Sequence, residues 1–336
     1  MIELAHMGLD LPGFSLDDIN LSIGEGDFFA LIGPTGSGKS LVLEGMMGLI
    51  PFTRGRLLLE GKDLASIPVE KRPLSIVYQD FALFPHLTVA ENICYGVNYH
   101  GISKAETRRR LDRLVGVLGL SHLLSRYPRK LSGGEKQRTA LARSLILNPR
   151  VLLLDDPLSA LDPAFRDEAK SLLGEIHREL STTLVMVTHD FNDVLSLANG
   201  AAVIRNGRIQ QAGTVQEIFH HPRSRFVAEF TGMKNILPLD GVGDIFPHLD
   251  AGPDHGFVCI RPEAIRREIG RSGIENPLEI AQARFLGAQD RMGFSEVRLG
   301  IGTQVFTAFW PPSSLENLDL GQILNIGFPH SALHTF

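Results

Sequence analysis

"GPTGSGKS", residues 33–40, places glycine, four residues, glycine, lysine and serine between an apolar run and a helix-forming stretch. Glycines let backbone amides turn inward around phosphate oxygens, and the start of the following helix adds partial positive charge. Lys39 adds a full positive charge, and Ser40 can reach Mg²⁺. The stretch predicts a phosphate-binding loop made of Gly33, Pro34, Thr35, Gly36, Ser37, Gly38, Lys39 and Ser40.

Four short apolar runs resemble strands that are buried on both faces, because their apolarity is continuous rather than alternating. Helical patterns lie between them, so parallel strands joined by crossovers are the expected architecture. Ligands bind at the carboxyl ends of the strands in such sheets, and a carboxylate there can hold Mg²⁺. The runs are "FFALIG", which leads into the glycine loop, "LSIVYQ" ending at Gln79, "VLLLDD" ending at Asp155 and Asp156, and "TLVMVTH" ending at His189.

The composition describes a globular protein of about two domains, with 336 residues of which 43% are apolar. A net charge of -5 excludes the basic field that would hold nucleic acid as a main partner. No apolar run reaches the roughly 18 residues that cross a bilayer, and the first residues lack a signal-peptide pattern, so we expect a soluble intracellular chain. Cys94 and Cys259 match no metal-site spacing.

The chain divides by pattern into an α/β part and a β part. Residues from about 80 to 150 are mostly helical and predict a helical subdomain inserted in the sheet domain; the arginines at 108–110 are expected on its solvated face. Asn206 and Gly207 predict a tight hairpin. From residue 233 onward, short strand candidates separated by glycine, proline and asparagine predict a small β-barrel or sandwich. We therefore expect domains at 1–232 and 233–336.

"LSGGEKQR", residues 131–138, contains one glutamate and one lysine but no histidine and no pair of carboxylates. Its side chains therefore do not form a set that could run a reaction of its own. Ser132 and Glu135 have the spacing of a helix capping box, which places Gly133 and Gly134 in a first turn whose outward amides attract anions. A cap that serves only its own helix is compatible with the same spacing.

Together, these motifs resemble the ATPase subunit of ABC transporters over residues 1 to about 232. The resemblance implies a P-loop NTPase fold, ATP and Mg²⁺. It makes Gly33–Ser40 the Walker A loop, Gln79 the Q-loop glutamine, Leu131–Glu135 the signature motif, Asp155 the Walker B aspartate, Ser159–Asp162 the D-loop and His189 the switch histidine. It implies catalytic roles for Asp156, His189 and Gln79, nucleotide contacts from Ser132, Gly133, Gly134 and Asp162, and metal ligation by Ser40, Gln79 and Asp155.

In that family, the signature loop acts on the γ-phosphate held by the other subunit of a head-to-tail dimer, which implies a homodimer. The family usually has glutamate where this chain has Asp156, whose carboxylate reaches about 1.5 Å less far. Hydrolysis is therefore expected to be slow unless the loop moves inward or a water intervenes. Phe14 is the candidate ring for adenine stacking, with a core position as the alternative.

The added β part resembles the accessory domains of an importer group, and "IRPEAI", residues 260–265, resembles a stretch that recurs in them. It implies a small OB-like (TOBE-type) all-β domain that either senses oxyanion or scaffolds the dimer. The importer resemblance also implies integral membrane permease subunits, an indirect solute-binding protein and a peripheral position on the cytoplasmic face of the cell membrane. The expected permease contact is an apolar cluster, partly buried in the subdomain itself: Phe81, Leu83, Phe84, Pro85 and Leu87.

Within the group, Leu41 after the phosphate loop, the compact "LPGFSLDDINLSI" start and "YQDFALFPHLTV" look closest to molybdate or tungstate importers. The alternatives are importers for sulfate, ferric ion, polyamine or sugar. Two further classes stay open: a soluble ABC protein of translation or DNA repair, and a nucleotide-gated regulator that barely hydrolyses ATP.

Overall fold

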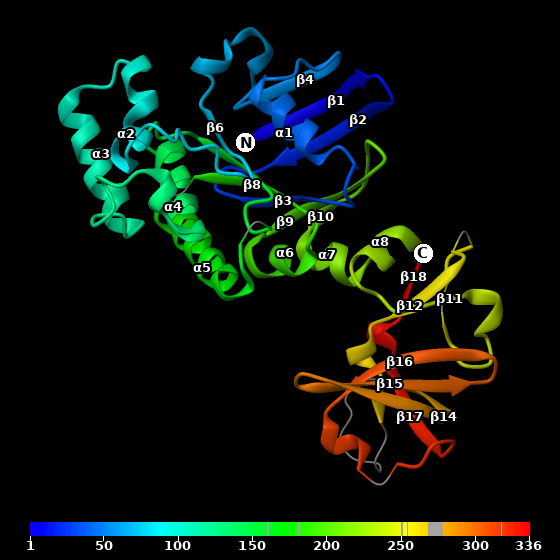
Figure 1. The fold of residues 1–336 in the computed structure, drawn as a ribbon. Helices are drawn as coiled ribbons and strands as arrows, with labels where there is room; N and C mark the ends of the chain where they lie inside the picture. Colours follow the sequence, from blue (N-terminus) through cyan, green and yellow to red (C-terminus); the bar gives the residue numbers. More distant parts are fainter. Residues whose placement is uncertain (160, 181, 250, 254, 268–277, 317) are drawn as a thin grey trace. The chain divides into compact units, whose positions relative to one another are not determined.

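The computed structural model divides the chain into two compact units, Met1–Val215 and Gln216–Phe336 (Figure 1). It describes residues 1–159, 161–180, 182–249, 251–253, 255–267, 278–316 and 318–336. The border between the units falls before the boundary predicted after residue 232, and that boundary stays a prediction. Within the described ranges, every helix is too short or too polar to cross a membrane.

A six-stranded sheet forms the centre of the first unit, in the order β10-β9-β3-β8-β7-β6. The four predicted runs are four of its strands, and they pair in parallel as predicted. β9 is parallel to β3, and β10 is antiparallel to β9. The bounds are β3 (Phe28–Ile32), β6 (Leu74–Val77), β7 (Val151–Asp155), β8 (Thr183–Thr188), β9 (Gly200–Arg205) and β10 (Arg208–Thr214).

The predicted hairpin joins β9 to β10, and Asn206 and Gly207 at its tip have φ angles of 49° and 73°. Two central residues with positive φ match the right-handed twist of the flanking strands, and asparagine and glycine tolerate that backbone better than other residues. The prediction is confirmed.

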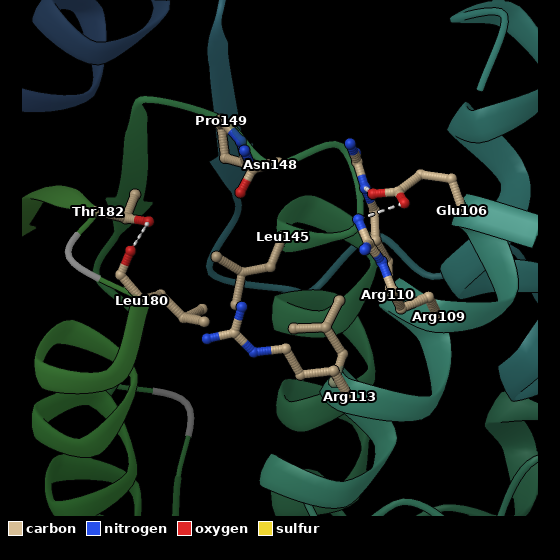
Figure 2. Close-up of a pocket in the computed structure, with 10 residues that line it drawn as sticks. Glu106, Arg109, Arg110, Arg113, Leu145, Asn148, Pro149, Leu180 and Thr182 are labelled. Carbon is tan, nitrogen blue, oxygen red and sulfur yellow. Dashed lines mark hydrogen bonds and ion pairs between the residues drawn. The ribbon is translucent and has the colours of Figure 1, made fainter. Parts of the chain in front are cut away.

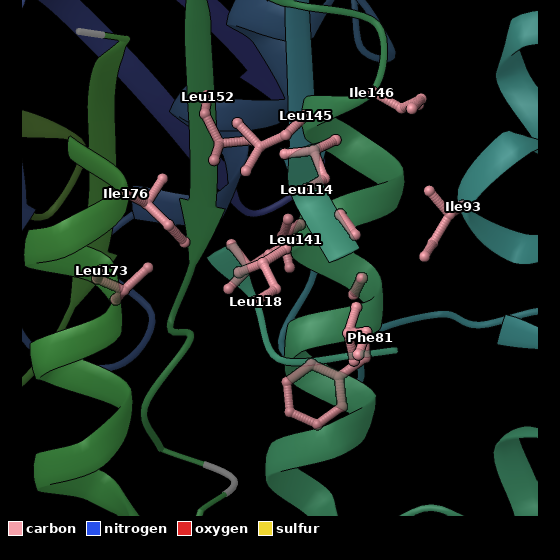
Figure 3. Close-up of a cluster of buried hydrophobic side chains, with 14 of the residues drawn as sticks. Phe81, Ile93, Leu114, Leu118, Leu141, Leu145, Ile146, Leu152, Leu173 and Ile176 are labelled. Carbon is pink, nitrogen blue, oxygen red and sulfur yellow. The ribbon is translucent and has the colours of Figure 1, made fainter. Parts of the chain in front are cut away.

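The central sheet is buried on both faces, which explains the continuous apolarity of its strands. In β8, Leu184 and Met186 face one hydrophobic cluster, while Val185 and Val187 face the other. Figure 3 shows the first cluster, in which α5 and α4 pack beside the strands. Burying each such side chain contributes about 1.5–3 kcal/mol, so the sheet is a firm base for groups at its edge.

A second sheet of the same unit has the order β2-β1-β4-β5, with antiparallel pairs throughout. It packs against the other face of the central sheet through the second cluster, to which α1 contributes Val42, Leu43 and Met46. The bounds are β1 (Ile2–Leu11), β2 (Phe14–Ile23), β4 (Arg54–Leu59), β5 (Lys62–Asp63) and α1 (Lys39–Met47).

Helices interrupt the strand series between β6 and β7, as the sequence predicts: α2 (Val89–Cys94), α3 (Lys104–Val117) and α4 (Gly133–Leu145). Side chains cap each start, because Thr88 and Ser132 form complete capping boxes and Ser103 accepts from the Glu106 amide. Two further helices, α5 (Pro163–Leu180) and α6 (Phe191–Leu197), flank β8 in sequence.

The second unit is rich in antiparallel strands, as predicted. Its sheets have the orders β11-β12-β18 and β13-β17-β14-β15-β16, and two short helices complete it. The bounds are α7 (Val215–His220), which begins at the border, α8 (Arg225–Phe230), β11 (Asn235–Pro238), β12 (Phe257–Ile260), β13 (Arg266–Arg267), β14 (Leu278–Arg291), β15 (Phe294–Ile301), β16 (Gln304–Trp310), β17 (Ile323–Pro329) and β18 (His334–Thr335).

A separate hydrophobic core holds the second unit together, centred on the fully buried rings of Phe306 and Phe328. Trp310 belongs to this core, and its indole donates to the Ile265 carbonyl at 2.8 Å, so its polar end is satisfied. Arg261 of the "IRPEAI" stretch is buried over the Phe219 ring and donates to the Thr231 carbonyl. Burial lowers the pKa of Arg261 to about 10.

Candidate functional site

The carboxyl ends of β3, β6, β7 and β8 open onto one cavity of about 480 Å³, which we call the strand-end cavity. The sequence places its predicted polar residues at these ends, and the structure brings them together. Its lining residues are Phe14, Thr35, Gly36, Gly38, Lys39, Ser40, Leu41, Gln79, Asp155, Asp156, Val187 and His189.

The backbone of the phosphate loop is packed too closely to accept side chains at two glycines. A Cβ atom at Gly33 would lie 2.2 Å from the carbonyl oxygen of Ile204 in β9. Gly38 has a φ of 101°, and a Cβ there would meet Leu16 and the Phe14 ring at 2.6 and 2.8 Å. Glycine is therefore required by space at Gly33 and by both space and backbone angle at Gly38.

The start of α1 carries no side-chain cap among the described residues. The first amides of a helix have no partner within the helix, and they bear partial positive charge. In α2, α3 and α4, a side chain fills this role. The first turn of α1 is therefore the one in this group with no amide bound to a side-chain cap, and its amides stay available for an anion.

Lys39 and Ser40 are held by the loop and by the adjacent strand end. The Lys39 ammonium donates to the carbonyls of Gly33 and Pro34 at 2.9 Å each. Ser40 Oγ donates to Asp155 Oδ1 at 2.9 Å. Burial lowers the pKa of Lys39, and the charges of Asp156 and Asp155 oppose that effect.

Burial raises the pKa of the Asp155 carboxyl, and the nearby charge of Asp156 adds to this effect, while the bond from Ser40 opposes it. The neighbours Glu44 and Tyr78 also have raised pKa values, mainly because of burial. A carboxylate in such surroundings is stabilised by a bound cation. The paired oxygens of Ser40 and Asp155 are the hard ligands that Mg²⁺ prefers, so these residues fit that ion.

Asp156 and His189 form a pair at the edge of the cavity, with 2.9 Å between Asp156 Oδ2 and His189 Nδ1. An ionised carboxylate only accepts hydrogen bonds, so Nδ1 of the imidazole carries a hydrogen in this pair. Asp156 has a φ of 44°, a left-handed backbone that aspartate tolerates better than most residues. Its amide donates to the Val187 carbonyl, which fixes this turn against β8.

Phe14 and Gln79 both line the strand-end cavity. Phe14 begins β2 and is half-buried; it packs against the second hydrophobic cluster as well as lining the cavity. The ring thus has a core contact and borders the cavity, and its stacking on adenine stays a prediction. Gln79 follows β6 and is exposed.

Four predicted residues lie elsewhere on the chain, since neither the start of α4 nor the segment before α5 lines the strand-end cavity. The capping box is confirmed: Ser132 Oγ accepts from the Glu135 amide, and Glu135 accepts from the Ser132 amide at 2.7 Å. Gly133 and Gly134 form the first turn of α4, and Asp162 is exposed just before α5. One copy of the chain therefore assembles only part of the predicted set.

A charged network that the sequence analysis missed lies behind His189. Arg166 of α5 donates to Asp190 at 2.7 Å and to Asp193 at 2.6 Å, and Lys170 lies 2.9 Å from the other Asp193 oxygen. The Asp193 side chain is 1% exposed, so its charge depends on these partners. The two bases are four residues apart and the two acids are three apart, and such spacings are ordinary on helices, so no sequence signal singled these residues out.

Comparisons with known proteins agree with this geometry. A family model described as "ABC transporter" matches residues 16–159. The molybdate/tungstate import ATP-binding protein WtpC of Pyrococcus horikoshii is 36% identical over 100% of both chains. The chain belongs to the family of ABC transporter ATP-binding proteins of the import type.

Two further relatives extend the comparison. The sulfate/thiosulfate import ATP-binding protein CysA of a Synechocystis species is 42% identical over 67% of this chain and 63% of that protein. A dimeric ATP-binding cassette, solved in a post-hydrolysis state with ADP and phosphate, covers 64% of this chain and 99% of its own, with a TM-score of 0.56 and 28% identity.

We predict that Asp155→Asn stabilises the nucleotide-free chain at pH 7. Because burial raises the folded-state pKa of Asp155, folding is favoured most below the ordinary aspartate pKa of about 3.9 and loses that advantage as pH rises through the folded pKa. The midpoint of thermal unfolding should therefore be higher for the variant at pH 7, and its gain should shrink as pH falls through the folded pKa of Asp155 toward the ordinary aspartate value. The exposed Asp167→Asn is the control, and an equal gain for both variants would contradict the prediction.

Proposed function

We propose that this chain is the ATP-hydrolysing motor subunit of an importer, acting peripherally on the cytoplasmic face of the cell membrane. The observation that supports it most is the strand-end cavity, where Lys39, Ser40, Gln79, Asp155, Asp156 and His189 meet beside the uncapped start of α1. ATP is the substrate that fits a phosphate loop followed by acids at neighbouring strand ends.

Within this proposal, the loop amides and Lys39 bind the β- and γ-phosphates, and Phe14 packs against the adenine. Ser40, Asp155 and Gln79 would hold Mg²⁺, which supplies charge neutralisation of the phosphates when it is bound. Lys39 already donates to Gly33 and Pro34, so it exchanges these carbonyls for phosphate oxygens on binding.

Asp156 is the group placed to accept a proton from the attacking water. The water oxygen forms a bond to the γ-phosphorus, the bond to the β-phosphate oxygen breaks, and the water proton passes to Asp156. His189 orients the Asp156 carboxylate through its Nδ1–H. Gln79 lines the same cavity and positions the same water in this proposal.

Ser132, Gly133, Gly134 and Asp162 act on the nucleotide of a second copy in this proposal. They lie outside the strand-end cavity of their own chain, while the first turn of α4 presents amides that attract an anion. A head-to-tail homodimer supplies each pocket with the missing half. The relative that was solved as a dimer with ADP and phosphate supports a dimer.

An apolar groove of about 590 Å³ is the proposed docking site for a short helix of the integral membrane permease subunits; we call it the aromatic groove. It includes Met47, Tyr78, Phe84, Tyr95, Arg143 and Leu147. Of the predicted apolar cluster, Phe81 is buried in the core, Phe84 lines the groove and Pro85 is exposed, the expected mixture. Apolar grooves of this kind accept amphipathic helices.

Buried polar contacts fix the shape of this groove. The Asn92 side chain is fully buried and exchanges hydrogen bonds with the Phe84 backbone in both directions. Arg143 donates to the carbonyls of Phe81 and Ala82, which have positive φ angles of 63° and 44°, and lies 5.3 Å from the centre of the Phe84 ring. The segment after β6 is thus held in an otherwise unfavourable backbone form.

Molybdate or tungstate is the proposed solute, delivered by a solute-binding protein that contacts the permease and not this chain. Full-length similarity to the Pyrococcus horikoshii importer supports this choice. The sulfate/thiosulfate relative has a higher sequence identity, but its match covers only 67% of this chain. Sulfate is therefore the second candidate. The second unit supports either a ligand sensor or a dimer scaffold.

We expect Asp156→Asn to lower steady-state ATP hydrolysis by about 100- to 10,000-fold, because it removes the proton acceptor. ATP binding should persist, since the phosphate loop is unchanged. Asp156→Glu should keep or raise the rate, because it restores the reach that is usual in the family. The measurements are phosphate release and equilibrium ATP binding.

Asp167→Asn, on the exposed face of α5, is the matched control and should hydrolyse ATP at the native rate. Unchanged hydrolysis in Asp156→Asn would refute its catalytic role. A steep loss in Asp156→Glu would instead show that the site is shaped around aspartate.

The shared pocket predicts that two defective chains restore activity when mixed. Lys39→Ala removes the phosphate-loop charge, while Ser132→Asp keeps a good helix cap but repels phosphate. Heterodimers of the two hold one intact pocket, so an equal mixture should recover about a quarter of the native rate. A mixture no more active than either variant alone would contradict the head-to-tail arrangement.

Tyr95→Ala should uncouple hydrolysis from transport in the complex with its permease and solute-binding protein. Tyr95 lines the aromatic groove, so basal ATP hydrolysis should be unchanged while stimulation by tungstate falls at least about tenfold. Tyr99→Ala, which alters a ring that is 74% exposed and outside the groove, is the control. Normal stimulation in Tyr95→Ala would refute the docking site, and stimulation of the native complex by sulfate alone would refute the solute.

A further inference from the structure

The three arginines at 108–110 do not share one solvated face. Arg108 is 78% exposed and pairs with Asp112, one turn along α3. The Arg109 side chain is 79% exposed, whereas that of Arg110 is only 28% exposed. Both arginines form ion pairs with the carboxylate of Glu106. The sequence prediction therefore holds for Arg108 and fails for Arg110, because α3 turns that side toward a cavity.

This cavity measures about 490 Å³ and lies between α3, the end of α4 and the end of α5, all within the first unit (Figure 2). We call it the arginine cavity. None of the residues assigned to ATP lines it. Its lining residues are Glu106, Arg109, Arg110, Arg113, Leu114, Leu145, Asn148, Pro149, Leu180 and Thr182.

The arginine cavity has an excess of positive charge. Among the described residues, Glu106 is its one acidic lining residue, against Arg109, Arg110 and Arg113. Hydrogen bonds from Arg110 hold the pKa of Glu106 below its usual value, so this carboxylate is ionised and neutralises one arginine. Two positive charges are left without a matching acid in the lining.

Two of the guanidinium groups are fixed in place by helix ends. Arg110 Nη1 donates to the Ile146 carbonyl at 3.0 Å, and Arg113 Nη2 donates to the Glu179 carbonyl at 3.3 Å. Figure 2 shows Arg113 reaching from α3 toward Leu180, across the cavity. A guanidinium group has five N–H donors, so these hydrogen bonds orient the two groups and leave other N–H donors for a ligand.

The remaining lining is partly apolar and partly polar. Leu114 and Leu145 are buried in the first hydrophobic cluster, and Pro149 and Leu180 complete the apolar side of the cavity. Asn148 and Thr182 add neutral side chains that can both donate and accept hydrogen bonds. Guanidinium groups that line one space offer several N–H donors to the oxygens of a tetrahedral oxyanion.

We propose that the arginine cavity is a second anion site, which binds a phosphate-type tetrahedral oxyanion between Arg109, Arg110 and Arg113. A ligand there would join α3 to the end of α5 and would lie at the opposite end of α4 from Ser132. The site is independent of the assigned motor function, since it shares no residue with the strand-end cavity.

The test measures binding of inorganic phosphate, sulfate and tungstate by isothermal titration calorimetry, at constant ionic strength. Lys39→Ala is the background for every variant, so that binding at the phosphate loop is suppressed equally. We expect saturable binding that Arg109→Ala and Arg113→Ala each weaken at least about tenfold. Arg108→Ala, one residue from Arg109 and paired outside the cavity, should change the affinity less than about twofold.

The three oxyanions identify the source of the ligand: preference for phosphate indicates a phosphate metabolite, and preference for tungstate indicates the solute type. Arg109 is exposed, so Arg109→Ala keeps the proposal testable if Arg113→Ala fails to fold. Absence of saturable binding by all three anions would overturn the proposal. Equal losses in Arg108→Ala and Arg109→Ala would also overturn it, because they would show a general effect of surface charge.

Discussion

The close packing of the phosphate loop on β9 is the constraint on which the candidate site depends. With Gly33 pressed against the Ile204 carbonyl, the loop leaves β3 in one direction and α1 begins at a fixed place. The parallel pairing of β3 with β8, and of β8 with β7, then sets His189 and Asp155 at the same edge. No side chain is needed to bring these groups together, because the sheet register does so.

The same edge is unfavourable for folding on its own. Lys39 and Asp155 are both partly desolvated, and Asp156 has a left-handed backbone. Residues keep such locally unfavourable states only where the surrounding structure holds them in place. Here, the strands behind the edge are buried on both faces, and burial of each apolar side chain contributes about 1.5–3 kcal/mol. The two apolar layers thus hold the unfavourable groups of the empty site in the positions that a ligand needs.

Sequence patterns were sufficient wherever backbone periodicity carries the information. Continuous apolarity gave the parallel strands, Asn206 and Gly207 gave the hairpin, and the spacing of Ser132 and Glu135 gave the cap of α4. Contacts between distant segments could not be read in this way. The burial of Asp193 and the turn of Arg110 into a cavity depend on the packing of helices whose relative rotation no local pattern encodes.

α4 connects the separate sites of the first unit, because each of its turns contacts a different one. Its start presents Ser132 and its glycines, and the buried Gln137 donates to the carbonyl of Pro157, the residue after Asp156. Farther along, Arg143 holds the backbone of the aromatic groove, and Ser144 donates to Ile76 of β6, the strand that leads to Gln79. The helix ends at Leu145, in the wall of the arginine cavity. One helix therefore holds the glycines of its first turn, the strand ends, the aromatic groove and the arginine cavity in fixed relation within the first unit.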